Sequence, residues 1–300
     1  MDNGTGGMED LEVTTHRHSE LDSLIRLLAD DHEKMQSMVS ARLLELGKRI
    51  VPSLWDARSA VSETVRSRID DILARLSSEA GGELALSEWR GLVEVSGEVD
   101  LEHGVSILAK LHTPDLSWAP YETMLDQMAD ELAIRLSGIH DPNDIVEMFT
   151  KYIFKEQGYK GGQDADYFNA DQHYLDRVIQ KKSGVPIALS LVCLLLADRL
   201  SLPVFGVGLP DHFIVKYQNN ETEILFAPFH HGAVITREEC EEFVIRRRLR
   251  FTDEILAPVT NRYILERMLG NLRRVYLHCH ERDKIKVVMQ YMKLVTGEHT

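Results

Sequence analysis

The chain has 300 residues, of which 44% are hydrophobic, and a formal net charge of −14. This length suits two domains with proper cores, and the acidic charge argues against nucleic acid and anionic membranes as partners. Three cysteines without close spacing argue against a disulfide framework, no apolar run reaches the roughly 20 residues of a membrane span, and the N-terminus lacks the features of a signal peptide. We therefore expect a cytoplasmic protein.

The first part of the chain predicts a tail followed by helices. Residues 1–18 are polar and glycine-rich and predict a disordered tail. From Ser19 onward, apolar residues recur at helical spacing, and one helix is expected to end at Leu46, with Gly47 as its C-cap. Further helices are predicted around Leu54, from Val65 to Leu76, and separately from Leu84 to Val95.

The segment from Leu27 to Gly47 combines an acidic turn, Asp30-Asp31, with a helix that ends in Leu-Glu-Leu-Gly. In this it resembles a HEAT repeat, and residues 66–76 resemble a weaker second copy. The resemblance implies a HEAT-like helical region over residues 19–95. Two copies are too few for a free-standing solenoid, so this region should pack against other helices.

The middle of the chain predicts three more helices and a polar loop. The helices lie around Val105, Leu125 and Phe149, and Asp141-Pro142 caps the last of them. Residues 157–170 form a polar loop with three glycines, long enough to be either a flap over a site or merely flexible.

Residues 183–229 predict a helix followed by a β-hairpin. Pro186 suits the first position of an apolar helix that continues to Ala197, because proline lacks only an N–H that would be unpaired there. Two runs of strand-forming residues, 212–218 and 221–226, flank Asn219-Asn220, a pair that suits a two-residue turn. That turn sets Val215 against Ile224 and His212 against Ala227.

The last 65 residues predict three helices. The helix 237–248 ends in Arg246-Arg247-Arg248, a run that we expect to be a solvated helix end. The helices 261–277 and 282–295 should pack antiparallel as a TPR-like hairpin. The predicted fold class is α+β and mostly α, with a small antiparallel sheet. The predicted regions are a tail (1–18), a HEAT-like region (19–95), a core (96–235) and a C-terminal helical region (236–300).

An ordered set of motifs carries a family resemblance over most of the chain. The motifs are Lys-Ser-Gly-Val-Pro-Ile-Ala-Leu-Ser (182–190), Leu-Pro-Val-Phe-Gly-Val-Gly-Leu-Pro (202–210), His-Phe-Ile-Val-Lys (212–216) and Ala-Pro-Phe-His-His-Gly (227–232). In these the chain resembles the SirB-type branch of the transglutaminase-like superfamily, bacterial proteins with a papain-like core. The resemblance implies a core of that kind.

The same resemblance implies a catalytic triad of Cys, His and Asp, whose positions here hold Pro186, His212 and Ala227. Asp211 stands where glycine is usual, and strand alternation aims its side chain away from His212. Ser190 and Cys193 follow Pro186 on the same helix face. Neither lies at the helix N-terminus, where the helix dipole would stabilise an anionic nucleophile, and both are expected to point into the core. The nucleophile and its orienting carboxylate are therefore both missing.

We expect a non-catalytic protein that binds a protein or peptide in a vestigial cleft, with no catalytic residue, no cofactor and no metal. The expected binding residues are His212, Asp211, Pro186, Ser190 and Phe229. One alternative is a thiol hydrolase or acyl transferase that uses Cys193 and His212, and another is a purely structural role. The sequence does not predict an oligomeric state.

Overall fold

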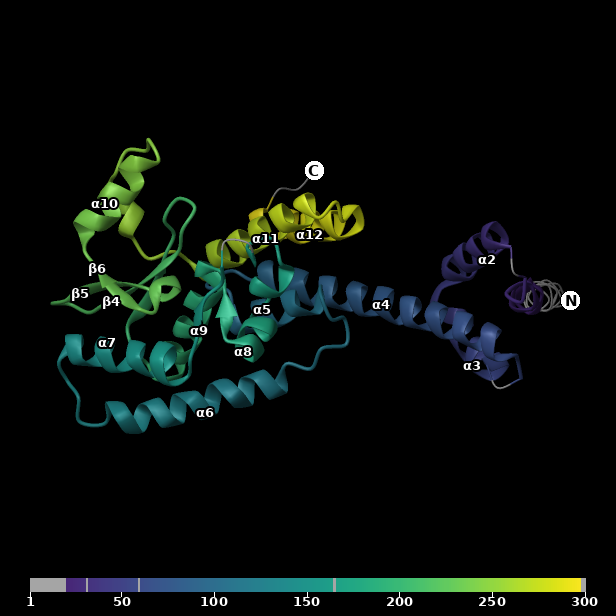
Figure 1. The fold of residues 1–300 in the computed structure, drawn as a ribbon, viewed down its shortest axis with the longest axis horizontal. Helices are drawn as coiled ribbons and strands as arrows, with labels where there is room; N and C mark the ends of the chain where they lie inside the picture. Colours follow the sequence, from purple (N-terminus) through teal and green to yellow (C-terminus); the bar gives the residue numbers. More distant parts are fainter. Residues whose placement is uncertain (1–19, 31, 59, 164–165, 298–300) are drawn as a thin grey trace, which may run out of the picture. The chain divides into compact units, whose positions relative to one another are not determined.

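The computed structural model describes residues 20–30, 32–58, 60–163 and 166–297, and the chain divides into two compact units, Met1–Leu84 and Ala85–Thr300 (Figure 1). The predicted tail, residues 1–18, lies outside the described residues. Helices dominate both units, and one four-stranded antiparallel sheet lies in the second. The predicted class, α+β and mostly α, is confirmed.

The first unit is built from short helices around a core of its own. Residues 20–27 are helical, followed by α2 (Glu33–Leu46), a 3₁₀ turn (Gly47–Ile50), α3 (Val51–Arg58) and the first part of α4 (Glu63–Val93). Gly47 ends α2 with a φ of +67°, as predicted. The apolar stripes join in one buried cluster that includes Leu28, Leu43, Leu54, Ile69 and Leu76.

Helix α4 corrects one prediction. We expected separate helices at 65–76 and 84–95, but a single helix of 31 residues runs from Glu63 to Val93. Glycine inside a helix costs only about 1 kcal/mol, so Gly81-Gly82 does not have to end it. Buried residues hold the helix on both sides of these glycines, since Leu76 lies in the first unit's core and Trp89 is fully buried in the second.

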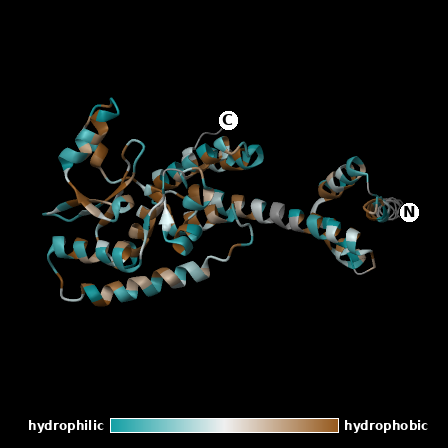
Figure 2. Cartoon of the chain, in the orientation of Figure 1, coloured by the Kyte–Doolittle hydropathy of each residue, from teal (hydrophilic) through white to brown (hydrophobic). Residues whose placement is uncertain are grey.

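The second unit surrounds one apolar helix, α9 (Pro186–Arg199), whose residues from Ile187 to Ala197 are all buried. Hydrophobic and hydrophilic residues alternate on the helices around it (Figure 2). Helices α6, α8 and α11 and strands β3 and β4 contact α9. The other helices of this unit and their bounds are α5 (Leu101–Lys110), α6 (Ala119–Leu136), α7 (Pro142–Thr150), a π-helix (Lys151–Glu156), α8 (Leu175–Lys181), α10 (Arg237–Arg246), α11 (Asn261–His278) and α12 (Arg282–Thr296).

The sheet contains the predicted hairpin and two more strands. Its order is β3 (Val204–Val207), β4 (Ile214–Gln218), β5 (Glu223–Ala227) and β6 (Ala233–Ile235), with every neighbouring pair antiparallel. The sheet supplies the strand ends that shape one side of the site.

The predicted register of the hairpin is wrong by two residues. Val215 pairs with Phe226 rather than Ile224. The turn is longer than predicted because the Asn219 carboxamide oxygen accepts hydrogen bonds from the backbone N–H groups of Glu221 (2.9 Å) and Thr222 (2.7 Å). A shift of two keeps every side chain on its predicted face. Lys216 and Glu223 form an ion pair, at 2.9 Å.

Candidate functional site

One cavity brings together several of the residues singled out by the sequence. Pro186 is the first residue of α9 and follows the N-cap Val185, as predicted. His212 lies in the segment just before β4. Both line a cavity of about 290 Å³, called the cleft below. The other residues of its lining are Gly162, Gln163, Asp166, Tyr167, Gln172, Val185, Asp211, Phe229, His230, Phe243 and Arg247.

The polar loop 157–170 forms one wall of the cleft. Within it, β1 (Lys160–Gly161) pairs in parallel with β2 (Ser183–Gly184), directly before α9. A Cβ on Gly161 would lie 2.7 Å from the backbone oxygen of Phe229, so this close approach requires glycine. The pairing ties the loop's first part to the helix start. Gln163 and Tyr167 then reach the cleft.

The His212 imidazole lies among rings, without the partner that a catalytic base needs. The rings of Phe243, His230 and Phe229 have centroids 5.4, 5.7 and 6.4 Å from it. Within the described residues, no carboxylate is hydrogen-bonded to the imidazole. Burial lowers its pKa to about 4, and the neighbouring His230 and Arg247 act in the same direction. The ring is therefore neutral at pH 7 and a weak proton acceptor.

Ala227 does not face His212, and this expectation is corrected. It pairs with Ala233 of β6 and is 1% exposed. The longer turn moves position 227 two residues along β4, and β4 begins only at Ile214, after His212. The Ala227 methyl packs in an apolar cluster with Ile214, Val244 and other residues. It is not among the described residues that line the cleft.

Asp211 lies beside His212 on the cleft, not on the opposite face as expected. Strand alternation does not apply because both residues precede β4. The backbone of Asp211 is left-handed, with a φ of +54°, a conformation that favours glycine, which the family resemblance places at this position. Its carboxylate approaches Arg247 at 3.7 Å and Arg274 at 4.0 Å.

Ser190 and Cys193 point into the core, as expected. The Ser190 hydroxyl is fully buried and donates a hydrogen bond of 2.8 Å to the backbone oxygen of Pro186. Cys193 is fully buried as well, and burial raises the pKa of its thiol far above the usual range. Neither residue lines the cleft within the described part of the chain, so Ser190 does not join the other expected binding residues there. A buried, protonated thiol is a poor nucleophile, which argues against a mechanism through Cys193 and His212.

Phe243, Arg247 and Arg267 were not assigned to this site by the sequence analysis. The Arg247 guanidinium stacks on Phe243, 3.6 Å from the ring centroid, although its arginine run was expected to be solvated. Arg267 of α11 donates a hydrogen bond of 2.8 Å to the backbone oxygen of His212. Sequence periodicity gives no signal for these contacts, because α10 and α11 reach the cleft only through tertiary packing.

In the described ranges, no group of three or more His, Cys, Asp or Glu side chains is placed to hold a metal ion. Over the same ranges, no helix has both the length and the apolar character needed to cross a bilayer.

The chain is similar in sequence to several known proteins. A UPF0162 protein of Xylella fastidiosa (strain 9a5c) is 29% identical over 225 residues, which cover 72% of this chain and 79% of the relative. A UPF0162 protein of Vibrio cholerae is 25% identical over 185 residues, covering 60% and 67%. F-box only protein 21 of Homo sapiens is 28% identical over 138 residues, covering 43% of this chain and 21% of that protein. No solved structure matches the chain significantly.

The match to a protein family covers the whole cleft. Residues 119–270, more than half of the chain, match the family described as the transglutaminase-like superfamily. The matched range contains Pro186, His212 and Ala227, and it includes α6 to α10 and the first half of α11. This protein therefore belongs to the transglutaminase-like superfamily.

Proposed function

We propose that this chain is a non-catalytic transglutaminase-like protein of the SirB-type branch, and that it binds a protein or peptide segment in the cleft. One observation carries the proposal: the cleft, of about 290 Å³, has proline where a nucleophile would stand at the helix start. Its histidine has a pKa near 4 and no carboxylate partner among the described residues. The cavity is present without the groups that acyl transfer needs.

The lining favours an extended peptide with an apolar or aromatic side chain. Phe229 and Phe243 offer ring faces, while Gln163 and Gln172 offer hydrogen-bonding groups. The volume suits one or two side chains rather than a folded surface. The loop residues Gly162, Gln163, Asp166 and Tyr167 line the cleft, where a bound segment would contact them.

Site-specific photocrosslinking tests this proposal. A photoreactive benzoylphenylalanine at Gln163, on the exposed rim of the cleft, should crosslink a discrete partner in the source bacterium. The same group at Glu221, on the exposed β4–β5 turn, is the control and should not capture that partner. An additional Pro186→Trp change, which fills the cleft, should abolish the crosslink. Equal capture from both positions, or capture that persists with the cleft filled, would contradict the proposal.

A thiol-labelling experiment tests the enzyme alternative in the same protein. Cys279 is exposed and serves as the internal positive control, whereas Cys193 is buried. In the native protein, a thiol reagent should modify Cys279 quickly and Cys193 only after denaturation. Rapid native labelling of Cys193 would revive the thiol mechanism.

A further inference from the structure

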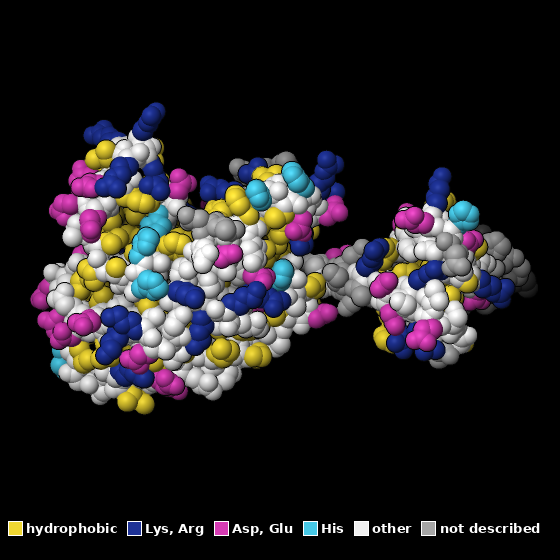
Figure 3. Space-filling model, viewed as in Figure 1, with side chains coloured by type: hydrophobic (Ala, Val, Ile, Leu, Met, Phe, Trp, Pro, Cys, Tyr) yellow, Lys and Arg dark blue, Asp and Glu magenta, His cyan; other side chains and the backbone are white. Residues whose placement is uncertain are grey.

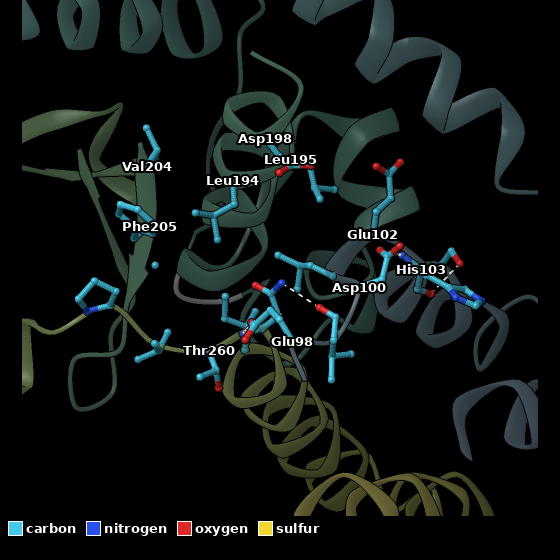
Figure 4. Close-up of a pocket in the computed structure, with 18 of the residues that line it drawn as sticks. Glu98, Asp100, Glu102, His103, Leu194, Leu195, Asp198, Val204, Phe205 and Thr260 are labelled. Atoms are coloured by element: carbon cyan, nitrogen blue, oxygen red, sulfur yellow. Dashed lines mark hydrogen bonds between the residues drawn. The ribbon is translucent and has the colours of Figure 1, made fainter. Parts of the chain in front are cut away.

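A second cavity of the second unit, the acidic groove, shares no lining residue with the cleft. Figure 4 shows residues that line this groove. Its volume is about 1020 Å³. Its walls come from α5, α6, α9, β3 and the start of α11. Five carboxylates and no Lys or Arg line it. These carboxylates are Glu98, Asp100, Glu102, Glu122 and Asp198.

Three of these carboxylates already have structural partners. Glu102 binds the Arg199 guanidinium at 2.7 and 2.9 Å and accepts a hydrogen bond from the Trp118 indole at 3.0 Å. Asp100 caps α5, and Glu98 accepts a hydrogen bond from the backbone N–H of Asn261.

The other two are available to a ligand. Glu122 and Asp198 are exposed, and neither has a partner in the described part of the chain. The groove therefore presents two carboxylates that no described residue of the chain neutralises.

The groove also has an apolar side. Leu194 and Leu195 of α9 form part of its lining, and Val204 and Phe205 of β3 lie across from the helical wall (Figure 4). Phe205 is 40% exposed, unusual for a phenylalanine. An aromatic face beside carboxylates suits a guanidinium group, which stacks and pairs at the same time. The combined chemistry fits a segment that alternates arginine and apolar side chains.

The same chain exposes a segment of this kind at the end of α10. The arginine knob consists of Ile245, Arg248, Leu249 and Arg250. Ile245 is 54% and Leu249 48% exposed. The guanidinium groups of Arg248 and Arg250 make no ion pair or hydrogen bond with any described residue. Lys and Arg side chains gather at this end of α10 (Figure 3).

We propose that the acidic groove of one molecule binds the arginine knob of a second copy. The knob is not part of the groove's lining in its own chain, so the contact is intermolecular. The contact joins two different surfaces, so it leads to a reciprocal dimer, to a larger closed ring or to an open chain of molecules. The proposal does not depend on what the cleft binds.

The effect of removing carboxylates distinguishes binding through the groove from non-specific association. Each copy carries −14, so two copies repel each other at long range. Removing acidic groups should favour non-specific association, because it lowers this repulsion. If the groove is the interface, removing its carboxylates should weaken association instead.

Analytical ultracentrifugation of the full chain over a range of concentrations tests the proposal. The groove variant is Glu122→Gln with Asp198→Asn. Its dissociation constant should rise by about five- to tenfold, as expected for the loss of partly exposed charge pairs. The matched control, Asp130→Asn with Glu221→Gln, removes the same charge from exposed positions elsewhere in this unit. The control should associate at least as tightly as wild type.

A mixing experiment identifies the two surfaces. The knob variant, Arg248→Asn with Arg250→Gln, should associate as weakly as the groove variant. Mixed together, the two variants still supply one intact groove and one intact knob, so they should form a one-to-one dimer and nothing larger.

Three outcomes would overturn the proposal. In the first, the wild type stays monomeric at its highest soluble concentration. In the second, the groove variant associates as tightly as its control. In the third, the mixture of the groove and knob variants does not form the dimer. If a monomeric wild type nevertheless binds a synthetic peptide of residues 243–252, the groove takes basic segments of other proteins instead. Circular dichroism should confirm that all variants are folded.

Discussion

At the scale of single residues, the surroundings of His212 differ from those of a catalytic base. Its ring faces Phe243, Phe229 and His230, with Arg247 and Arg267 nearby. Burial and these cationic or potentially cationic neighbours all disfavour the charged imidazole. The same ring beside a carboxylate would have a higher pKa.

The first prediction concerns the titration of His212. Its pKa of about 4 lies below the ordinary 6.5, so between these values the unfolded chain binds a proton that the folded chain does not. The share of stability due to His212 is complete above pH 6.5 and is lost as the pH falls toward 4, by roughly 3 kcal/mol in all. An NMR titration of the ring proton should give the low value directly.

A matched pair of variants tests the cause. Arg247→Gln should raise the pKa of His212, because one neighbouring cation is removed. Arg246→Gln changes the adjacent arginine, which pairs with Glu242, and should leave the pKa unchanged. A His212 that titrates near 6.5 in wild type would contradict the description of the cleft given above.

Asp176 supports a second prediction at this scale. Its side chain is fully buried in α8, burial raises its pKa, and Arg177 Nε lies 3.4 Å from it. Neither carboxylate oxygen has a hydrogen bond of normal geometry to a described residue. A raised pKa means that the stability contribution is present at acid pH and is lost as the pH rises.

Asp176→Asn should therefore stabilise the protein at pH 7, and its advantage should shrink as the pH falls toward the ordinary value of 3.8. Urea unfolding of both proteins at pH 7 and pH 4.5 measures the difference. Asp130→Asn, at an exposed position, is the control and should change the stability little at either pH. A variant advantage that does not change with pH would show that the carboxylate's titration is not responsible.

At the scale of elements, the length of the β4–β5 turn sets the register of the two strands and therefore the position of Ala227. The sequence predicted both strands and both faces, because strand-forming residues alternate in 212–218 and 221–226. The Asn219 side chain closes a longer turn than predicted, and Val215 pairs with Phe226. Ala227 consequently lies in the apolar cluster under α10 rather than opposite His212.

This placement predicts the effect of enlarging Ala227. Ala227→Leu adds volume to a packed cluster and should destabilise the protein by about 1–3 kcal/mol. Its cross-strand partner Ala233 is exposed, so Ala233→Leu, the matched control, should change the stability by less than about 0.5 kcal/mol. Chemical denaturation measures both. Equal effects at the two positions would contradict the difference in burial between Ala227 and Ala233.

At the scale of the whole molecule, the two units have separate hydrophobic clusters. Leu54 belongs to the cluster of the first unit, and α9 forms the centre of the other. A large-to-small change in one cluster should therefore act within its own unit.

Leu54→Ala should cost the first unit about 2–5 kcal/mol, because Leu54 is fully buried. Hydrogen exchange should speed up in α2 and α3 and stay unchanged in α9, and the NMR signal of His212 should not move. Trp55→Ala, next to it in α3 but exposed, is the control and should have little effect. Loss of protection in α9 would show that the two units unfold together.

The sequence by itself determined most of the helices, the two strands of the hairpin, the apolar helix that begins at Pro186 and the burial of Ser190 and Cys193, because these follow from local spacing and residue type. The superfamily also follows from local motifs. HEAT-like and TPR-like regions and the domain boundaries at 95 and 235 stay predictions.

Only the tertiary structure decided what surrounds His212, where Ala227 lies and that Arg247 reaches the cleft. It also decided that five carboxylates from several elements meet in one groove. These outcomes depend on the length of one turn and on the packing of α10 and α11. Contacts between residues far apart in the chain are set by the balance of many packing energies, and no local pattern records that balance.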